Sequence, residues 1–276
     1  MILNLDPNFK PIEDNEIQFE SFIFSGGEPH IKINPNFNLS ESITITHRIN
    51  SFNDLGLLCI AVDALQRMNA KVENLIIPYF PAARQDRLMI KGEPLTVKVY
   101  ADIINTLHFK KVIIFDAHSE VTPAVVNNCE DVSNKKFIEN VIQKIGNDVL
   151  LISPDGGALK KIYKVSEFLG GIEVIECSKS RNVKTGKLTG FKVYADDLEG
   201  KDCLIGDDIC DGGGTFIGLA EELKKKNAGK LYLAVSHGIF SKGFGELECF
   251  ERIFTTDSVK NIENDCVTQI KLKDVL

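Results

Sequence analysis

The chain has 276 residues, of which 43% are hydrophobic and 26% are charged, and its formal net charge is -7 at pH 7. This composition is ordinary for a globular enzyme, and the length suits one large or two small domains. The negative charge argues against a nucleic-acid-binding protein that relies on overall basic charge. Because no signal-peptide pattern and no apolar run of about 18 residues is present, we expect neither secretion nor membrane spanning.

The seven cysteines are odd in number, scattered along the chain, and form no CxxC pair. Disulfide frameworks and zinc sites need paired or closely spaced cysteines. We therefore interpret these residues as reduced thiols of a cytoplasmic protein. They are Cys59, Cys129, Cys177, Cys203, Cys210, Cys249 and Cys266.

Apolar segments rich in β-branched residues alternate with segments of helical period after the first 50 residues, which look like short strands and turns. Such an alternation is typical of a mainly parallel sheet covered by helices. The predicted elements are, in chain order, a helix over 51–68, a strand over 72–79, a helix over 93–107, a strand over 111–116, a helix near 135–144, a strand over 148–153, a helix over 158–168, strands over 172–177 and 202–207, a helix over 215–226, and a strand over 230–236.

This order predicts an α/β fold with two Rossmann-like domains, each a mainly parallel sheet flanked by helices. The economical division lies near residue 135. It gives an N-terminal domain over 1–135 and a C-terminal domain over 136–276, with the tail of the chain free to pack on the N-terminal domain.

The segment IGDDICDGGGTF (205–216) places three glycines between a predicted strand and a predicted helix. We expect the strand to end at Asp207 and Thr215 to cap the helix. Glycines 212–214 allow backbone N–H groups to converge on an anion at the helix start. On the glycines alone, an ordinary strand-to-helix turn is an equally good interpretation, and neither a GxxxxGK[ST] nor a GxGxxG pattern is present.

The acidic residues beside the glycines narrow the choice of ligand. Carboxylates repel phosphate, but they accept hydrogen bonds from sugar hydroxyls and can hold Mg²⁺. Asp207 and Asp208 next to a glycine and threonine cradle therefore suit a sugar phosphate, with the phosphate in the cradle and the hydroxyls on the acids.

The same segment resembles the phosphoribosyl-pyrophosphate (PRPP) loop of type I phosphoribosyltransferases and PRPP synthetases, which consists of two acids and then D-x-x-G-T. Asp211, Gly214 and Thr215 match this pattern, while Gly212 stands where a Thr or Ser is usual. The loop alone does not separate an enzyme that makes PRPP from one that consumes it.

The segment LIIPYFPAARQDR (75–87) places Arg84, Gln85, Asp86 and Arg87 after a predicted strand, where the two guanidinium groups can clamp a polyphosphate. Taken alone, it is better interpreted as a solvated charged loop. It resembles the Y-x-R-Q-D segment of ribose-phosphate diphosphokinases (PRPP synthetases). The resemblance implies that Arg84, Gln85 and Asp86 lie at the ATP site, with the Arg-Gln pair on ATP itself.

The segment FSGGEPHIKI (24–33) is similar to the F-[SA]-[DN]-G-E element of the same family. The resemblance implies that Phe24 stacks on adenine and that Glu28 bonds its exocyclic amine, often from the neighbouring subunit. Gly26 departs from the family, because Asp or Asn is usual there. Without the family, these residues are better interpreted as a β-turn.

Two further strand ends carry candidate polar residues. VIIFDAHSE (112–120) brings His118 to the carboxyl end of a strand, where open α/β sheets bind ligands, although a single histidine is more often buried and structural. The family's D-x-H pattern implies a place near Mg²⁺ and the ATP phosphates. LISPDGGALKK (151–161) resembles the family's S-P-D-x-G segment, and its sequence is close to that of the short archaeal-type synthetases. The resemblance implies that Asp155 is a metal ligand or faces the ribose phosphate.

A basic stretch, ECSKSRNVKTGKLTGFKV (176–193), follows a predicted strand. One interpretation is an exposed hairpin. It also resembles the family's mobile catalytic loop with a K-x-R signature, which Lys179 and Arg181 match.

These motifs follow the family's order and cover nearly the whole chain. The resemblance implies two phosphoribosyltransferase-like domains, with ATP bound by 1–135 and ribose 5-phosphate by 136–276. It implies transfer of the diphosphoryl group of ATP to the C1 hydroxyl of ribose 5-phosphate, with Mg²⁺ as cofactor, in a homodimer or higher homo-oligomer with no nucleic-acid or membrane partner. The implied residues are Lys179, Arg181 and His118 for catalysis, His118 and Asp155 for metal, and Asp207, Asp208, Asp211, Gly212, Gly213, Gly214 and Thr215 for ribose 5-phosphate.

Two other functions share part of these features. A phosphoribosyltransferase that consumes PRPP has the glycine turn, but it needs neither the ARQDR nor the FSGGE segment. A non-catalytic regulatory protein associated with PRPP synthetases is expected to lack His118, Asp155 or the K-x-R pair, and all of these are present here.

Overall fold

The fold is given by a computed structural model that describes residues 1–146, 148–181 and 188–276, without the side chains of 180–189. The chain divides into two compact units. The first is Met1–Ser133 with Leu272–Asp274 and Leu276, and the second is Asn134–Lys271 with Val275. Each unit has a hydrophobic core of its own.

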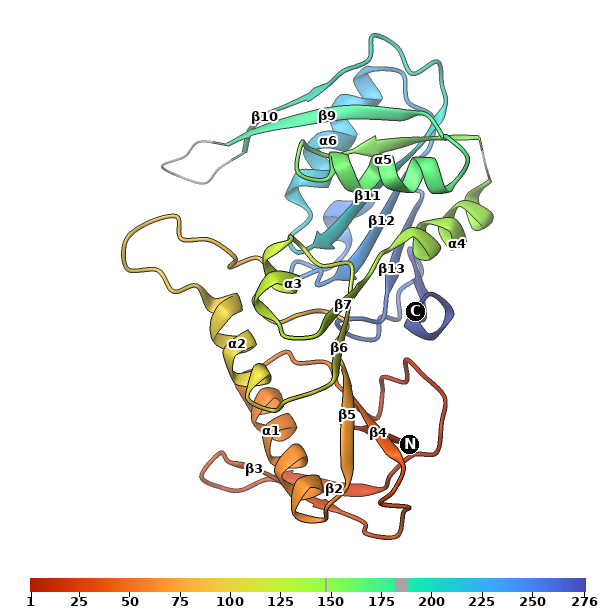
Figure 1. Cartoon of the computed structure of the whole chain (residues 1–276). Helices are drawn as coiled ribbons and strands as arrows, with labels where there is room; N and C mark the ends of the chain where they lie inside the picture. Colours follow the sequence, from red (N-terminus) through yellow and green to blue (C-terminus); the bar gives the residue numbers. More distant parts are fainter. Residues whose placement is uncertain (147, 182–187) are drawn as a thin grey trace. The chain divides into compact units, whose positions relative to one another are not determined.

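The first unit contains a sheet of five parallel strands and a separate antiparallel hairpin. Its elements are β1 Ile2–Asn4, β2 Phe19–Ile23, β3 Pro29–Ile33, β4 Ser42–Thr46, α1 Phe52–Arg67, β5 Lys71–Ile76, α2 Thr96–Asn105, β6 Lys111–Phe115, α3 Val121–Val125 and β7 Cys129–Val132. The sheet order is β1-β4-β5-β6-β7. The β2–β3 hairpin lies beside α1 (Figure 1).

Helix α1 begins and packs as its sequence predicts. The Ser51 hydroxyl accepts a hydrogen bond from the Asp54 N–H at 3.2 Å and donates one to the Asp54 carboxylate at 2.9 Å. This cap satisfies an N–H group that has no partner within the helix. The buried face of α1 then covers the sheet with Leu55, Leu58, Ala61, Val62 and Leu65.

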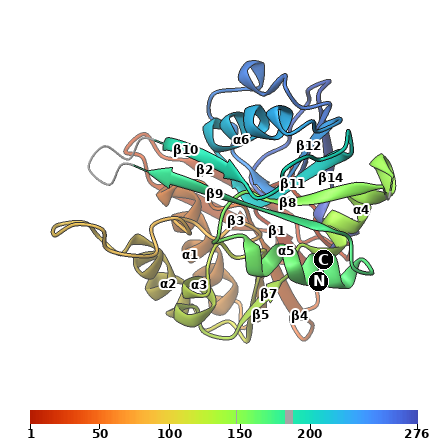
Figure 2. The same ribbon diagram turned by 90° about the horizontal axis from the view of Figure 1, so that it is seen from above.

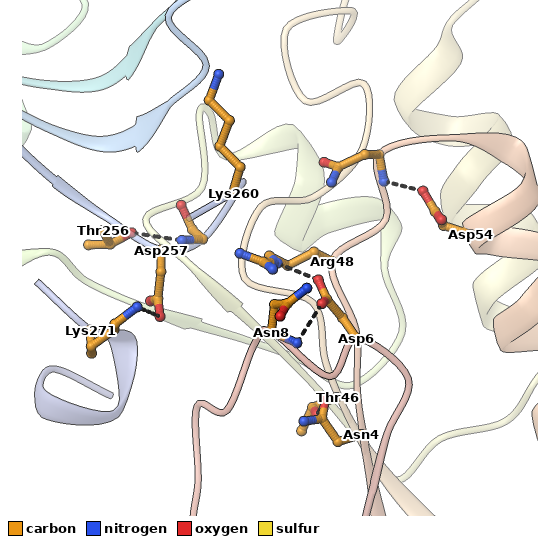
Figure 3. A network of polar contacts seen from close by, with 12 residues as sticks. Asn4, Asp6, Asn8, Thr46, Arg48, Asp54, Thr256, Asp257, Lys260 and Lys271 are labelled. Carbon is orange, nitrogen blue, oxygen red and sulfur yellow. Dashed lines mark hydrogen bonds and ion pairs between the residues drawn. The ribbon is translucent and has the colours of Figure 1, made fainter. Parts of the chain in front are cut away.

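A partly buried ion pair joins the loops that follow β1 and β4. Arg48 donates from Nε to the Asp6 carboxylate at 2.5 Å, and the Asn8 N–H donates to the same carboxylate at 3.0 Å (Figure 3). The Arg48 guanidinium also lies 5.2 Å from the centre of the Phe9 ring. Because Arg48 is only 6% exposed, this pair holds the two loops together at the carboxyl edge of the sheet.

The second unit contains a sheet of seven strands, in the order β10-β9-β8-β11-β12-β13-β14, all parallel except β10. Helices α5 and α6 lie on opposite faces of this sheet (Figure 2), as right-handed crossovers require. Its elements are α4 Lys135–Ile145, β8 Val149–Ser153, α5 Leu159–Phe168, β9 Val174–Arg181, β10 Leu188–Val193, β11 Asp202–Cys210, α6 Gly214–Lys225, β12 Leu231–Gly238, β13 Arg252–Thr256 and β14 Val267–Ile270.

The predicted fold class, two mainly parallel sheets flanked by helices, is confirmed. Two local predictions at the glycine turn were wrong. Strand β11 does not end at Asp207, because its pairing with β12 continues to Cys210. Thr215 does not cap α6, because Gly213, with a φ of 76°, is the N-cap and the helix starts at the following residue.

The cysteines are free thiols, as predicted. Burial raises the pKa of Cys203 and of Cys210 to about 12, so both are inert members of the core. No helix in the described ranges combines the length and the apolar character needed to cross a membrane.

Candidate active site

The second unit has a topological switch point between β8 and β11, because the chain proceeds outward from β8 to β9 on one side and from β11 to β12 on the other. Open α/β sheets bind ligands at the carboxyl edge at such a point. β8 and β11 are parallel neighbours, with Ile152 opposite Ile205. The acids just beyond these two residues, Asp155, Asp207 and Asp208, therefore gather at this edge.

Asp155 connects the end of β8 to Lys179 of β9. The Lys179 ammonium forms an ion pair with the Asp155 carboxylate, and both side chains are about one-fifth exposed, at 19% and 21%. The same carboxylate accepts the N–H groups of Gly157 at 2.8 Å and Ala158 at 3.0 Å. Burial raises the pKa of Asp155, but Lys179 and these donors outweigh it and hold the pKa below its usual value. Asp155 is therefore an ionised carboxylate that fixes Lys179 at the switch point.

The basic stretch that carries Lys179 is an antiparallel hairpin where the structure describes it, with Lys179 opposite Phe191 of β10. Its interpretation as a hairpin is confirmed for β9 and β10. Lys179 and the backbone of Arg181 thus belong to a strand, and not to a loop as the family motif implied. The side chain of Arg181 and residues 182–187 lie outside the described residues.

Asp207 and Asp208 form a carboxyl pair beside Asp155. Burial, then the charge of Asp208 and a hydrogen bond with its side chain, raise the pKa of Asp207 well above its usual value, and the charge of Asp155 adds to the rise. The Asp208 N–H donates to Asp207 at 2.9 Å, which only partly opposes it. The pair therefore retains a proton that an isolated aspartate would lose. Hydroxyl donors or a cation at the pair would favour its charged form.

The glycine turn leaves backbone donors at the start of α6. The N–H groups of Phe216 and Ile217 donate to the Gly213 carbonyl at 2.9 and 3.1 Å. The N–H groups of Gly214 and Thr215 have no partner within the helix. A side-chain carbon at Gly214 would meet no described atom within 4 Å, so this side of the turn is open. Donors at a helix start with open space beside them suit an anion, and the binding of an anion at this cradle stays a prediction.

We expect Gly213→Ala to lower the melting temperature and Gly214→Ala to leave it unchanged or slightly higher. At Gly213 the left-handed backbone costs alanine about 1–2 kcal/mol, and its Cβ would lie 3.0 Å from Leu247 Cδ2. Gly214 has neither constraint and lies within the helix. Thermal denaturation followed by circular dichroism measures both variants, and equal melting temperatures would contradict the prediction.

In the first unit, Asp86 connects the ARQDR segment to the loop after β6. It is 7% exposed and accepts hydrogen bonds from Arg87, at 3.2 Å, and from Ser119. Burial raises the pKa of Asp86, but these bonds and the nearby His118 outweigh it, so the pKa lies below its usual value. Two predicted motifs, ARQDR and D-x-H, thus meet at the carboxyl edge of this sheet.

We expect Asp86→Asn to destabilise the protein by about 1–3 kcal/mol at neutral pH, the usual cost of losing a charged hydrogen-bond acceptor in a buried site. Because the folded-state pKa of Asp86 is depressed, its contribution is fully present above the unfolded pKa of about 3.9 and is lost as pH falls through the folded value. Melting temperatures of wild type and variant should therefore converge in acid.

The control for this experiment is Asp63→Asn. Asp63 pairs with Arg67 on the surface of α1, where both side chains are more than half exposed, so its loss should cost little. A destabilisation of Asp86→Asn that persists unchanged in acid would show that the carboxylate charge is not the cause.

The other residues that the family resemblance assigned to ATP have contacts of their own. Gln85 accepts a hydrogen bond from the Thr96 hydroxyl at 2.6 Å, which ties the loop to the start of α2, and Arg84 is exposed. Phe24 is 51% exposed at the tip of the β2–β3 hairpin, and its ring centre lies 4.8 Å from that of Phe22. The hairpin tip is the β-turn that the sequence also allowed, since the Gly27 N–H donates to the Phe24 carbonyl at 2.8 Å.

Glu28 folds back over this turn. A Cβ at position 26 would lie 2.5 Å from Glu28 Oε2, so the glycine at that position makes room for the carboxylate. A side chain at Gly26 would require Glu28 to move.

The two predicted metal-binding residues lie in different units, His118 in the first and Asp155 in the second. Within the described residues, no three His, Cys, Asp or Glu side chains gather into a group that could hold a metal ion by themselves. Sequence reasoning also missed two supporting residues: Ser119, which bonds Asp86, and Asp131, which accepts the Ala117 N–H at 2.9 Å and fixes the loop of His118. Neither belongs to a recognisable spacing pattern.

Comparisons with known proteins agree with this architecture. The family described as the N-terminal domain of ribose phosphate pyrophosphokinase matches residues 13–107. A protein of Mycoplasmopsis pulmonis named ribose-phosphate pyrophosphokinase is 30% identical over 215 residues, which cover 76% of this chain and 67% of the relative. A protein of Vibrio cholerae with the same name is 29% identical over 255 residues, which cover 91% of this chain and 76% of the relative.

The fold has a close counterpart among solved structures. The crystal structure of phosphoribosylpyrophosphate synthetase from Mycobacterium smegmatis matches 94% of this chain and 87% of its own, with a TM-score of 0.80 and 22% identity. That likeness supports the fold, and the sequence relatives add the family. The chain belongs to the ribose-phosphate pyrophosphokinase family.

Proposed function

We propose that this chain transfers the diphosphoryl group of ATP to the C1 hydroxyl of ribose 5-phosphate, giving PRPP and AMP. It is a diphosphate-transferring enzyme by family membership. The observation that carries the proposal is the cluster at the switch point of the second unit, where three carboxylates and Lys179 lie at the edge that also bears the anion cradle. Such a site suits a ligand with both a phosphate and sugar hydroxyls.

On the acceptor side, we assign ribose 5-phosphate to the domain over 136–276. The cradle of Gly212, Gly213, Gly214 and Thr215 holds the 5-phosphate through backbone N–H groups. The carboxylates of Asp207, Asp208 and Asp211 accept hydrogen bonds from the ribose hydroxyls and orient the sugar. The raised pKa of Asp207 supports this role, because hydroxyl donors would replace the proton that the carboxyl pair now shares.

On the donor side, we assign ATP to the domain over 1–135. Arg84 and Gln85 fix the phosphates, Asp86 holds the segment that carries them, and Phe24 and Glu28 contact adenine. The exposure of Arg84 and Phe24 supports these roles, because both side chains reach the protein surface. A planar guanidinium is well suited to phosphate oxygens, and an exposed ring to a base.

The residues present fit Mg²⁺ as cofactor. Mg²⁺ keeps several water ligands and is usually held by one or two carboxylates together with substrate phosphates, so a complete protein cage is not needed. Asp155 is ionised and 21% exposed, and can offer one oxygen on the acceptor side. His118 would offer one donor on the ATP side. Bound Mg²⁺ would supply neutralisation of phosphate charge.

The catalytic contribution of the chain is electrostatic. Phosphoryl-type transfer needs in-line positioning and charge neutralisation more than covalent participation of the protein. Lys179 lies beside the acids of the acceptor site, so its ammonium, together with Arg181, would stabilise negative charge on the transferring group. His118 would assist on the ATP phosphates.

The direct test is AMP release from ATP, Mg²⁺ and ribose 5-phosphate, measured by chromatography with PRPP as co-product. We expect equimolar AMP and PRPP, and no AMP when ribose replaces ribose 5-phosphate. An active preparation that instead releases pyrophosphate from PRPP and a nucleobase would point to a phosphoribosyltransferase. Absence of both reactions would favour a regulatory protein.

We also propose that the protein is cytoplasmic and forms a homodimer or higher homo-oligomer. Size-exclusion chromatography with light scattering tests the oligomeric state.

A further inference from the structure

The backbone does not explain the glycine at position 212. Of the three glycines in the turn, only Gly213 has a positive φ. What lies beside Gly212 is the side chain of Lys242: a Cβ at position 212 would lie 3.5 Å from Cε, 3.6 Å from Cδ and 3.8 Å from Cγ of that lysine. The stem of Lys242 therefore runs across Gly212, and a larger side chain pointing the same way would displace it.

The segment that carries Lys242 is bonded to the glycine turn. The N–H groups of Ile239 and Phe240 both donate to the Cys210 carbonyl, at 2.9 and 3.1 Å, and the Ser241 N–H donates to the Asp211 carbonyl at 3.1 Å. β11 and β12 are parallel neighbours, so the two loops leave the sheet at the same edge. The backbone before Lys242 is thus fixed to the loop that enters the cradle.

Apolar packing also holds the segment that carries Lys242. Phe240 is 4% exposed, and its ring centre lies 4.8 Å from that of Phe244. Leu247 is buried and lies against Gly213. The Gly243 N–H closes a turn onto the Phe240 carbonyl at 3.1 Å. Lys242 is therefore an exposed side chain on a firmly held turn.

The charge of Lys242 is available to a ligand. In the part of the chain that the structure describes, no carboxylate forms an ion pair with its ammonium. The ammonium is one bond beyond Cε, the stem atom nearest to the Gly212 position. The ammonium therefore lies close to the glycine turn that leads into α6, whose first-turn N–H groups favour an anion themselves.

We propose that Lys242 is a phosphate-binding residue of the acceptor site, whose Nζ donates to the 5-phosphate from across Gly212 and selects phosphorylated over free ribose. The proposal rests on the function proposed above. Gly212 keeps the path of the lysine stem open. The Lys242 ammonium then adds a full charge to the partial charges that the backbone N–H groups offer to the 5-phosphate.

The test compares Lys242→Met with Lys164→Met. Methionine keeps most of the stem and removes the charge, and Lys164 is an exposed lysine of α5, away from the switch point, whose loss changes the net charge equally. We expect Lys242→Met to raise the KM for ribose 5-phosphate about 10- to 100-fold, the range for a hydrogen bond to a charged group. The KM for ATP and the melting temperature should not change, and Lys242→Arg should retain most of the affinity.

A binding measurement separates this inference from the proposed function. Calorimetry with ribose 5-phosphate, Mg²⁺ and an α,β-methylene analogue of ATP, in which the reacting bond cannot break, should show the same loss for Lys242→Met. If the wild type releases no AMP, the proposed function fails and calorimetry still tests Lys242. If the wild type is active and Lys242→Met keeps its KM and affinity for ribose 5-phosphate, the Lys242 assignment alone fails. Equal losses in Lys164→Met, or a lowered melting temperature with a raised KM for ATP, would also overturn it.

Discussion

Replacing Lys179 by alanine should lower kcat by about 10³-fold or more and leave the binding of ribose 5-phosphate nearly unchanged. Lys179 is the described cation paired with Asp155 at the switch point, whereas the proposed sugar-phosphate contacts come from β11 and the start of α6. A cation that stabilises charge on a transferring phosphoryl group acts mainly in the transition state, and losses of 10³-fold or more are typical on its removal. Rapid-quench measurement of AMP and calorimetry with the α,β-methylene analogue separate the two quantities.

The matched control is Lys192→Ala. Lys192 lies on β10 of the same hairpin, is exposed, and contacts the ring of Tyr194 with its ammonium 4.8 Å from the ring centre. Its loss should leave kcat close to the wild-type value. A Lys179→Ala enzyme with near-wild-type turnover, or one that loses affinity for ribose 5-phosphate in proportion to its rate, would remove Lys179 from the proposed role.

Replacing Asp207 by asparagine should lower kcat/KM by about 10²-fold and, at the same time, raise the melting temperature at neutral pH. The activity falls because a charged acceptor for the ribose hydroxyls is lost. The stability rises because the Asp207 carboxyl is partly buried and lies beside Asp208 and Asp155, which disfavour its ionised form. A gain of about 1 kcal/mol would raise the melting temperature by about 2–4 °C in a chain of this size.

The raised pKa of Asp207 also predicts how the stability difference between wild type and Asp207→Asn changes with pH. The folded-state pKa of Asp207 is raised, so the folded protein holds a proton that the unfolded chain releases. The stabilising contribution of Asp207 is therefore fully present below the unfolded pKa of about 3.9 and is lost as pH rises through the folded value. Asparagine does not ionise, so the Asp207→Asn variant does not lose this contribution. Its melting temperature should therefore exceed that of wild type by an amount that grows from acid to neutral pH.

Differential scanning calorimetry across pH measures this difference directly. The control is Asp148→Asn, an exposed aspartate just before β8. It should change neither activity nor the pH profile of stability. An Asp207→Asn variant that is less stable than wild type at neutral pH would show that the ionised carboxylate is compensated in the folded protein.

The sequence was sufficient to predict a strand or helix wherever the local residue pattern determines that element. The predicted helix over 51–68 forms as α1, because Ser51 caps it and its apolar residues share one face. The alternation of strands and helices predicted both sheets, because a parallel strand pair needs a crossover. Asp155 and Asp207 could be predicted to lie together, because Asp155 follows β8 and Asp207 lies near the carboxyl end of its neighbour β11.

The sequence was insufficient where a contact joins distant segments. Acids in 207–211 look like the end of a strand, but pairing with β12 keeps β11 regular to Cys210. Strand β13 and the edge strand β14 were not predicted, because their short apolar runs are stabilised by neighbours that the local pattern does not contain. Lys242 carries no spacing signal and lies about thirty residues after the glycine that it covers.

The ion pair between Lys179 and Asp155 has a consequence for what the site admits. An anion that drew Lys179 away alone would leave Asp155 as a partly buried carboxylate without its cation, and a cation on Asp155 alone would leave Lys179 without its carboxylate. Either outcome carries an electrostatic penalty. A phosphate group that arrives already chelated to a divalent ion satisfies both side chains in one event. With the proposed ligands, the pair would therefore favour the phosphate–cation complex over either of its free components.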